Sequence, residues 1–122
     1  MWQELKIGEF VKLLNTTKDA VRHYENLKFI TPRWINNNKE YGEKEVLNFQ
    51  VVKELKGYGL TLKEIQIIFN FKDAYHCGDK ELINQVFGQM TSHLNRLRQE
   101  EEELTKRRIT LENEVEKLRG LI

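Results

Sequence analysis

The stretch KIGEFVKLLNTTKDAVRHYENL, residues 6–27, decides the fold of this 122-residue chain. Apolar residues recur in its first half at three- and four-residue spacing, which predicts a helix over about residues 6–14. Asn15 interrupts the pattern, and Thr17 is a suitable N-cap for a second helix over about residues 18–27. Two short helices joined by a turn of three or four residues form a helix-turn-helix. The second helix is expected to direct three side chains outward: Lys18, Arg22 and His23.

A short polar hairpin with the form of a wing is predicted after the two helices. Arg33-Trp34-Ile35 begins it and Tyr41 closes it, with a run of three asparagines between. Asparagine tolerates left-handed backbone angles, so this run is expected to form the turn. Trp34 either packs under the wing, which we favour, or lies exposed.

Two further helices are predicted between the wing and residue 69. The first covers about residues 43–57 and ends at Gly57-Tyr58-Gly59, because glycine is a natural C-terminal cap. Thr61-Leu62-Lys63-Glu64 is a capping box, which starts the second of these helices and carries it through Phe69. The first is expected to bury Val46, Leu47, Phe49, Val52 and Leu55.

From Asp79 onward, apolar residues follow the alternating four- and three-residue spacing of a coiled-coil seam. A helix over residues 79–119 would be about 60 Å long. A chain of this size has no other face of that length, so we expect the seam to pack on a second copy. Glu101 and Arg108 are its charged positions: either they face each other across an antiparallel dimer, or the helices diverge there. The expected dimerisation residues are Ile83, Phe87, Met90, Leu94, Leu97, Leu104, Leu111, Val115 and Leu118.

Composition excludes several classes of protein. The chain has 20 Lys+Arg against 19 Asp+Glu and is 39% hydrophobic, too apolar for wholesale disorder. No apolar run is long enough for a membrane span, and the N-terminus does not have the pattern of a secretory signal. Cys77 is the single cysteine, so no internal disulfide is expected. We therefore expect a cytoplasmic protein. No nucleophile–base pair or phosphate-binding glycine loop is present, so neither enzyme activity nor a cofactor or metal is predicted.

With these elements placed, the sequence resembles the MerR family of transcription regulators over residues 5 to about 70. The resemblance implies a mainly α fold, with a winged helix-turn-helix DNA-binding domain over residues 1–75. A hinge and a long antiparallel coiled-coil dimerisation helix over residues 76–122 would follow. The chain ends directly after that helix, so we expect a short form without an effector domain. The motifs that carry the resemblance are Lys6-Ile7-Gly8-Glu9-Phe10, Val21-Arg22-His23-Tyr24-Glu25, Pro32-Arg33 with Lys39 and Tyr41, and Gly59-Leu60-Thr61-Leu62-Lys63-Glu64-Ile65.

The sequence departs from the family pattern at three places. Asn15-Thr16 stands where the family usually has Gly-Val, and Asn37-Asn38-Lys39 replaces Gly-Tyr-Arg in the wing. Lysine keeps the positive charge there but loses the bidentate fork of arginine. His23 stands where the family commonly has an aromatic residue beside Tyr24.

The resemblance also implies which residues bind DNA. Arg22 and His23 would reach base edges and phosphates, the alternative being that they are solvated helix residues. Tyr24 would pack its ring and point its hydroxyl to a phosphate, unless it serves the core alone. Most of the others would hold the DNA backbone, which fixes register and contributes salt-dependent affinity. The implied DNA-binding residues are Thr17, Lys18, Arg22, His23, Tyr24, Arg33, Asn38, Lys39, Tyr41 and Lys56.

Cys77 has three possible roles. Metal-sensing members of the family place a cysteine here, but the later cysteines that complete their site are missing from this sequence. A thiol-based redox or electrophile sensor is the second possibility. A structural cysteine at a hinge is the interpretation we favour.

Together these features predict a sequence-specific transcription regulator that binds double-stranded DNA as a homodimer. In the resembling family, such a dimer recognises a pseudo-palindromic operator and distorts the promoter spacer so that RNA polymerase can engage. The alternative is a winged-helix architectural factor similar to an excisionase. Such factors share the N-terminal motifs but usually lack so long a helix, which argues against the alternative.

Overall fold

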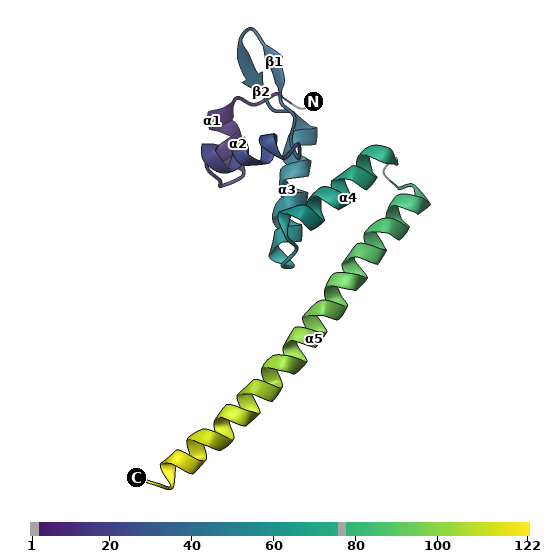
Figure 1. Cartoon of the computed structure of the whole chain (residues 1–122). Coiled ribbons are helices and arrows are strands. Elements are labelled where there is room, and N and C mark those ends of the chain that lie inside the picture. The colour runs from purple at the N-terminus through teal and green to yellow at the C-terminus, as the bar shows by residue number, and fades with distance from the viewer. Residues whose placement is uncertain (1–2, 76–77) are drawn as a thin grey trace. The chain divides into compact units, whose positions relative to one another are not determined.

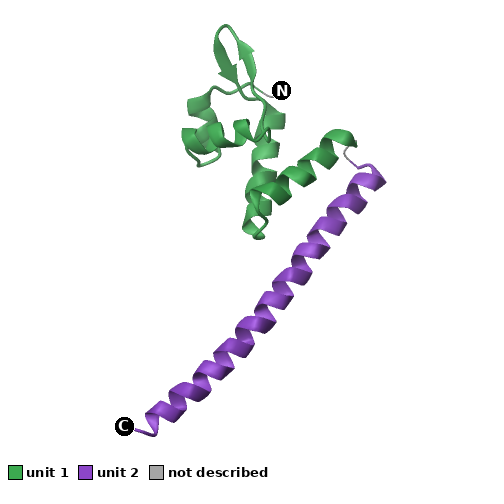
Figure 2. Cartoon of the chain, in the orientation of Figure 1, with its two compact units in different colours: residues 1–77 green, residues 78–122 purple. Residues whose placement is uncertain are grey.

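The computed structural model describes residues 3–75 and 78–122. The chain divides into two compact units, Met1–Cys77 and Gly78–Ile122 (Figure 2). Helices make up most of the described residues, which also form one two-stranded sheet, as the sequence predicted. In the described ranges, no helix is long and apolar enough to cross a membrane. The elements are α1 (Ile7–Leu13), α2 (Lys18–Asn26), β1 (Arg33–Ile35), β2 (Asn38–Glu40), α3 (Glu43–Gly57), α4 (Leu62–Ala74) and α5 (Lys80–Arg119) (Figure 1).

Helices α1 and α2 form the helix-turn-helix. Asn15 occupies the turn with a φ of 50°, which confirms that asparagine supplies the left-handed angle. The Thr17 hydroxyl accepts a hydrogen bond from the Ala20 N–H at 3.1 Å, so the predicted N-cap is also confirmed. Lys28, just after α2, has a φ of 66°, which its sequence pattern did not indicate.

Strands β1 and β2 form the wing, an antiparallel pair in which Trp34 lies opposite Lys39. Asn36 and Asn37 make its turn with φ values of 50° and 66°. Two successive positive φ angles are what a two-residue hairpin turn requires, so the asparagine run does what the sequence predicted. The base of the wing is tied to the N-terminal segment, because Leu5 and Tyr41 exchange two backbone hydrogen bonds of 2.8 and 2.7 Å.

Helices α3 and α4 complete the first unit. The bounds of α3 agree with the prediction, but Leu47 is 53% exposed and does not belong to the core. Its neighbour Val46 faces the core, and the next residue of a helix points about 100° away. The capping box of α4 is confirmed by hydrogen bonds between Thr61 and Glu64. The helix continues to Ala74, past the predicted end at residue 69, since residues 70–74 contain no glycine or proline to stop it.

The core of the first unit is a cluster of aromatic rings contributed by α1, α2, α3, α4 and the segments between them. Phe10 stacks on Tyr41 with ring centroids 4.4 Å apart and meets Phe49 edge-on at 5.9 Å. Tyr24 of α2 lies 5.4 Å from the same Phe49 ring. Such pairs contribute beyond their buried area. The cluster therefore fixes α2 relative to α3 and the base of the wing.

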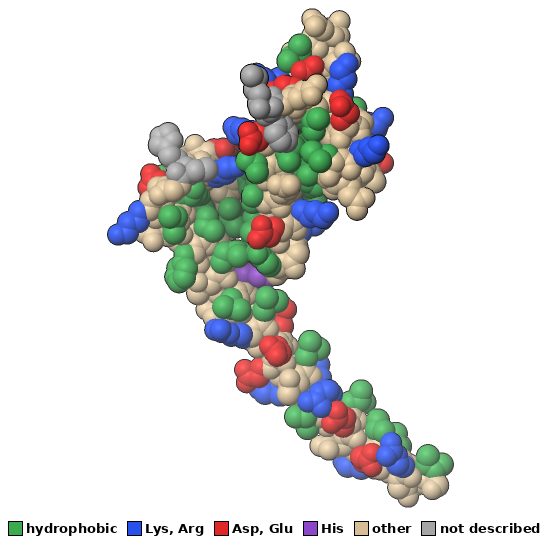
Figure 3. All heavy atoms as spheres, turned by 180° about the vertical axis from the view of Figure 1, so that it is seen from behind, with side chains coloured by type: hydrophobic (Ala, Val, Ile, Leu, Met, Phe, Trp, Pro, Cys, Tyr) green, Lys and Arg blue, Asp and Glu red, His purple; other side chains and the backbone are tan. Residues whose placement is uncertain are grey.

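The second unit is α5, one uninterrupted helix of 40 residues and about 60 Å. Asp79 caps its start by accepting a hydrogen bond from the Glu81 N–H at 3.0 Å. Ion pairs between residues one turn apart, such as Arg108–Glu112 at 2.6 Å, lie on its surface. Hydrophobic side chains recur among the charged ones along its length (Figure 3).

Candidate nucleic-acid interface

Helix α2 presents a polar face because its apolar residues are used by the core. Val21 is fully buried and Tyr24 is 8% exposed, while Arg22 and His23 are exposed, as expected. The side chain of Arg22 is 70% exposed, and its guanidinium lies 3.7 Å from Asp19. An exposed ion pair of that length contributes little and is easily exchanged. Arg22 is therefore available to a ligand that approaches α2.

Tyr24 and Lys56, which the sequence suggested separately, are in contact. The Lys56 ammonium donates to the Tyr24 hydroxyl at 3.4 Å and lies 5.9 Å from the centroid of its ring. The ring itself packs in the core against Phe29 and Phe49. This contact joins α3 to α2 and places a positive charge beside the Tyr24 hydroxyl.

Tyr41 is placed differently from the expectation that it contacts the DNA backbone. It is 1% exposed, and its hydroxyl donates to Glu25 at 3.2 Å. Burial raises the pKa of this phenol, and the neighbouring Glu25 carboxylate raises it further, so the phenol stays protonated and donates. A side chain so enclosed does not reach a phosphate. Tyr41 instead holds the base of the wing to α2.

Glu25 is the residue that sequence reasoning missed. Its carboxylate accepts the hydrogen bond from the Tyr41 hydroxyl and also forms an ion pair with the Lys39 ammonium at 3.3 Å. The side chain of Glu25 is only 13% exposed. A carboxylate so largely buried is costly unless it is paired, and here both the wing and its base supply partners. Glu25 therefore links the wing to α2. The only sign of this role in the sequence is that Glu25 directly follows Tyr24, a residue of the core.

Trp34 corrects the expectation that it packs under the wing. Its side chain is 68% exposed, and the Lys39 ammonium lies 5.5 Å from the centroid of its ring. The core lies beneath the base of this short hairpin, so Trp34 on β1 does not pack in it. A large aromatic ring is thus presented to solvent on the wing.

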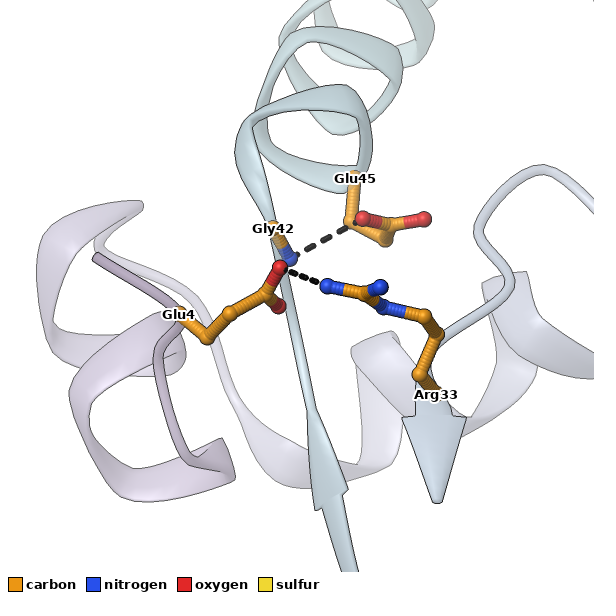
Figure 4. Close-up of polar contacts among 4 residues, drawn as sticks. All are labelled: Glu4, Arg33, Gly42 and Glu45. Atoms are coloured by element: carbon orange, nitrogen blue, oxygen red, sulfur yellow. Dashed lines mark hydrogen bonds and ion pairs between the residues drawn. The ribbon is translucent and has the colours of Figure 1, made fainter. Parts of the chain in front are cut away.

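Arg33 forms an ion pair with Glu4 (Figure 4). Beside it, Glu45 accepts a hydrogen bond from the Gly42 N–H at 2.9 Å, which caps α3. A Cβ atom at Gly42 would lie 3.0 Å from the Glu4 carboxylate, so the backbone and the acid fit closely. Arg33 remains 68% exposed while it ties β1 to the N-terminal segment.

A groove of about 410 Å³ separates α2 from the wing, and it brings several of the predicted residues together. Four of its lining side chains are cationic and one, Glu25, is anionic. This charge favours a polyanion, and the local excess stands out in a chain of net charge +1. The groove unites Lys18, Arg22, Asn38, Lys39 and Tyr41 of the predicted set, whereas Thr17, His23, Tyr24, Arg33 and Lys56 lie outside its lining. Its lining also includes Lys6 and Trp34, which were not in the predicted set.

Two other expectations concern Cys77 and metal ions. Cys77 lies outside the described residues, so its role stays a prediction. Within residues 3–75 and 78–122, no three His, Cys, Asp or Glu side chains are grouped as ligands of a metal ion.

Comparison with known proteins agrees with this geometry. Residues 5–72 match the family described as MerR HTH family regulatory protein. Over 72 residues the chain is 28% identical to the HTH-type transcriptional regulator ZntR homolog of Haemophilus influenzae, covering 57% of this chain and 53% of that protein. It therefore spans about half the length of this curated relative. The crystal structure of the transcription regulator PbrR691 from Ralstonia metallidurans CH34, in complex with lead(II), is similar with a TM-score of 0.53. Sequence identity is 25%, and the match covers 84% of this chain and 83% of that one.

Proposed function

The chain belongs to the MerR family of helix-turn-helix regulatory proteins, and we propose that it is a DNA-binding transcription regulator that acts as a homodimer. Its target would be a two-fold-symmetric operator in a promoter. The observation that carries this proposal is the cationic groove between α2 and the wing. Recognition by a helix-turn-helix places the second helix in the major groove of DNA, where base edges are distinguishable.

Within the interface, we assign base reading to Arg22 and backbone contacts to Lys18, Asn38 and Lys39. Arg22 projects from α2 on an exposed side chain, and a bidentate arginine–guanine contact discriminates by about 1–3 kcal/mol. The lysines line the neighbouring groove, which suits a strand of phosphates. His23 and Thr17 on α2, and Lys56 beside the Tyr24 hydroxyl, are further candidates at its margin.

The homodimer would form through α5. Its seam leaves large apolar side chains in water: Phe87 is 70% exposed, Leu104 61%, Leu111 65% and Leu118 62%. A seam with this spacing is complementary to another of the same kind, so a second copy is the natural occupant. The contact buried along a helix of 40 residues would then make the dimer the stable form.

For this dimer we propose an antiparallel register, which the spacing of the seam allows. In antiparallel coiled coils, the first core position of a heptad faces the fourth of the partner. One alignment pairs every seam position of α5 from Phe87 to Leu118 with a seam position of the partner. Glu101 and the partner's Arg108 then lie in adjacent layers, diagonally across the interface, and the symmetry axis repeats this contact. The facing positions are Phe87 with Leu118, Met90 with Val115, Leu94 with Leu111, Leu97 with Arg108, and Glu101 with Leu104.

We propose that the dimer regulates as members of this family do, by distorting the promoter spacer. RNA polymerase would then engage the distorted promoter. A homodimer would carry two recognition helices, one from each copy. An operator whose half-sites do not match their separation has to bend or untwist to engage both, at a cost of a few kcal/mol. The affinity of the dimer would therefore depend on how easily the promoter DNA is distorted.

The test is selection of a binding site by the full chain from random double-stranded DNA, followed by footprinting and DNA-bending assays on the selected site. We expect two inverted half-sites, protection on both, and two protein chains for each DNA molecule. Single, non-repeated sites bound by one chain would overturn the proposal. Strong bending without any sequence preference would instead favour the architectural alternative.

A further inference from the structure

We propose that Trp34 is a DNA-contacting residue of the wing, whose indole ring packs on the deoxyribose edge of the strand held in the groove. The inference rests on the proposed function and adds a non-ionic contact to it. The observation behind it is an aromatic side chain that is 68% exposed and lines a cationic groove. Tryptophan buried at an interface is among the strongest single anchors of binding.

The position of Trp34 fits a sugar rather than a base or another protein. Lys18, Lys39 and Lys6 line the same groove and would hold phosphates there. In a DNA strand each phosphate is flanked by two deoxyriboses, which are its apolar part. A ring set among lysines therefore meets the sugars of whichever strand those lysines bind. The indole Nε1–H is a donor that can pair with a phosphate oxygen at the ring edge.

The ring of Trp34 is held in position by contacts that lead back to α2. Its cross-strand neighbour Lys39 places its ammonium 5.5 Å from the ring centroid. Lys39 is itself paired with Glu25 of α2 at 3.3 Å. Trp34 is consequently positioned relative to the recognition helix although it lies on the wing. The wing contact and base reading by α2 would be made on one piece of DNA in a single geometry.

An apolar contact and an ionic contact respond differently to salt. Each phosphate neutralised by a lysine releases counterions and adds close to one unit to the slope of log K against log salt concentration. Burial of an indole ring on sugar releases no counterion. It therefore raises the affinity and leaves the slope of log K against log salt concentration unchanged. We expect Trp34→Ala to weaken binding by about 10- to 100-fold on operator and random DNA alike, with the slope unchanged.

The matched control is Ile35→Ala. Ile35 follows Trp34 on β1 and is 37% exposed, but among the described residues of β1 only Trp34 belongs to the lining of the groove. We expect Ile35→Ala to bind as the parent does, and Trp34→Phe to keep most of the affinity. Circular dichroism would establish that each variant is folded.

A second measurement reads the contact directly. The chain has two tryptophans, so in a Trp2→Phe variant the fluorescence comes from Trp34 alone. Acrylamide, an uncharged quencher, is expected to reach Trp34 in the free protein and to be excluded when the operator is bound.

The outcomes separate this inference from the proposed function. If the parent chain selects no DNA site, the proposed function fails. If the parent binds but Trp34→Ala binds equally well, or acrylamide quenching is unaffected by the operator, the inference about Trp34 fails alone. If Trp34→Ala keeps its DNA affinity but loses regulation in a transcription assay with purified RNA polymerase, the ring contacts a protein and the inference is wrong.

Discussion

Replacing Leu111 with alanine should weaken the dimer strongly, and the size of the effect follows from its exposure. Fully burying a leucine side chain is worth about 1.5–3 kcal/mol. Leu111 is 65% exposed on α5, so covering it on association would contribute about two-thirds of that, or about 1–2 kcal/mol. The two-fold axis removes the contact twice, for a total of about 2–4 kcal/mol. At about 1.4 kcal/mol per tenfold, the dissociation constant should rise by about 30- to 700-fold.

Sedimentation equilibrium over nanomolar to micromolar concentrations would measure this change. Ile109→Ala is the matched control, because Ile109 is 47% exposed on the same helix but lies outside the seam. Alanine is the better helix former in both variants, so neither should lose α5 itself. We expect the control to dimerise as the parent does.

Two results would refute the reasoning. Equal weakening by Ile109→Ala would mean that the interface does not follow the heptad seam. An unchanged dissociation constant for Leu111→Ala would mean that α5 is covered elsewhere or not at all. In either case the antiparallel register argued above would also be lost.

Three other sets of substitutions test separate parts of the proposal. Arg22→Ala should reduce the preference for the operator over random DNA. Lys39→Ala should weaken binding to operator and random DNA alike, and lower the slope of log K against log salt concentration by about one. Binding isotherms at several salt concentrations distinguish the two variants. Glu101→Arg and Arg108→Glu should each weaken the dimer several-fold, and the double exchange should restore it, as a double-mutant cycle by sedimentation would reveal. Cys77→Ser should regulate normally in transcription assays with and without a thiol oxidant, and an oxidant response that the variant abolishes would contradict the structural role.

The local structure of the first unit was largely predictable, because it depends on residues that act on their own backbone. Thr17 and the pair Thr61–Glu64 cap helices through hydrogen bonds three residues away. Asn15, Asn36 and Asn37 take positive φ angles, which asparagine tolerates better than most residues do. In each case the residue type and its immediate neighbours are enough to specify the conformation.

The placement of the wing side chains was less predictable, because it depends on what lies across from them. Period-two alternation does not say which face of a three-residue strand meets the core. The sequence therefore left both positions of Trp34 open, and the favoured one, under the wing, was wrong. Tyr41 was predicted to contact DNA because of its residue type and its motif. In the fold it lies close to α2, and its hydroxyl donates to Glu25 instead. Glu25 is a largely buried acid that contacts both Lys39 and Tyr41, and such a role leaves no periodic pattern in the sequence.

The two units should respond to substitution in separable ways, since one carries the groove and the other the seam. A seam variant lowers DNA affinity only by reducing the amount of dimer, so its defect should vanish at high protein concentration and leave base preference intact. A groove variant leaves sedimentation unchanged and alters base preference, as at Arg22, or salt slope, as at Lys39. Trp34 is expected in a third class, with lower affinity but both of those properties preserved. These three signatures assign each side chain its role from solution measurements alone.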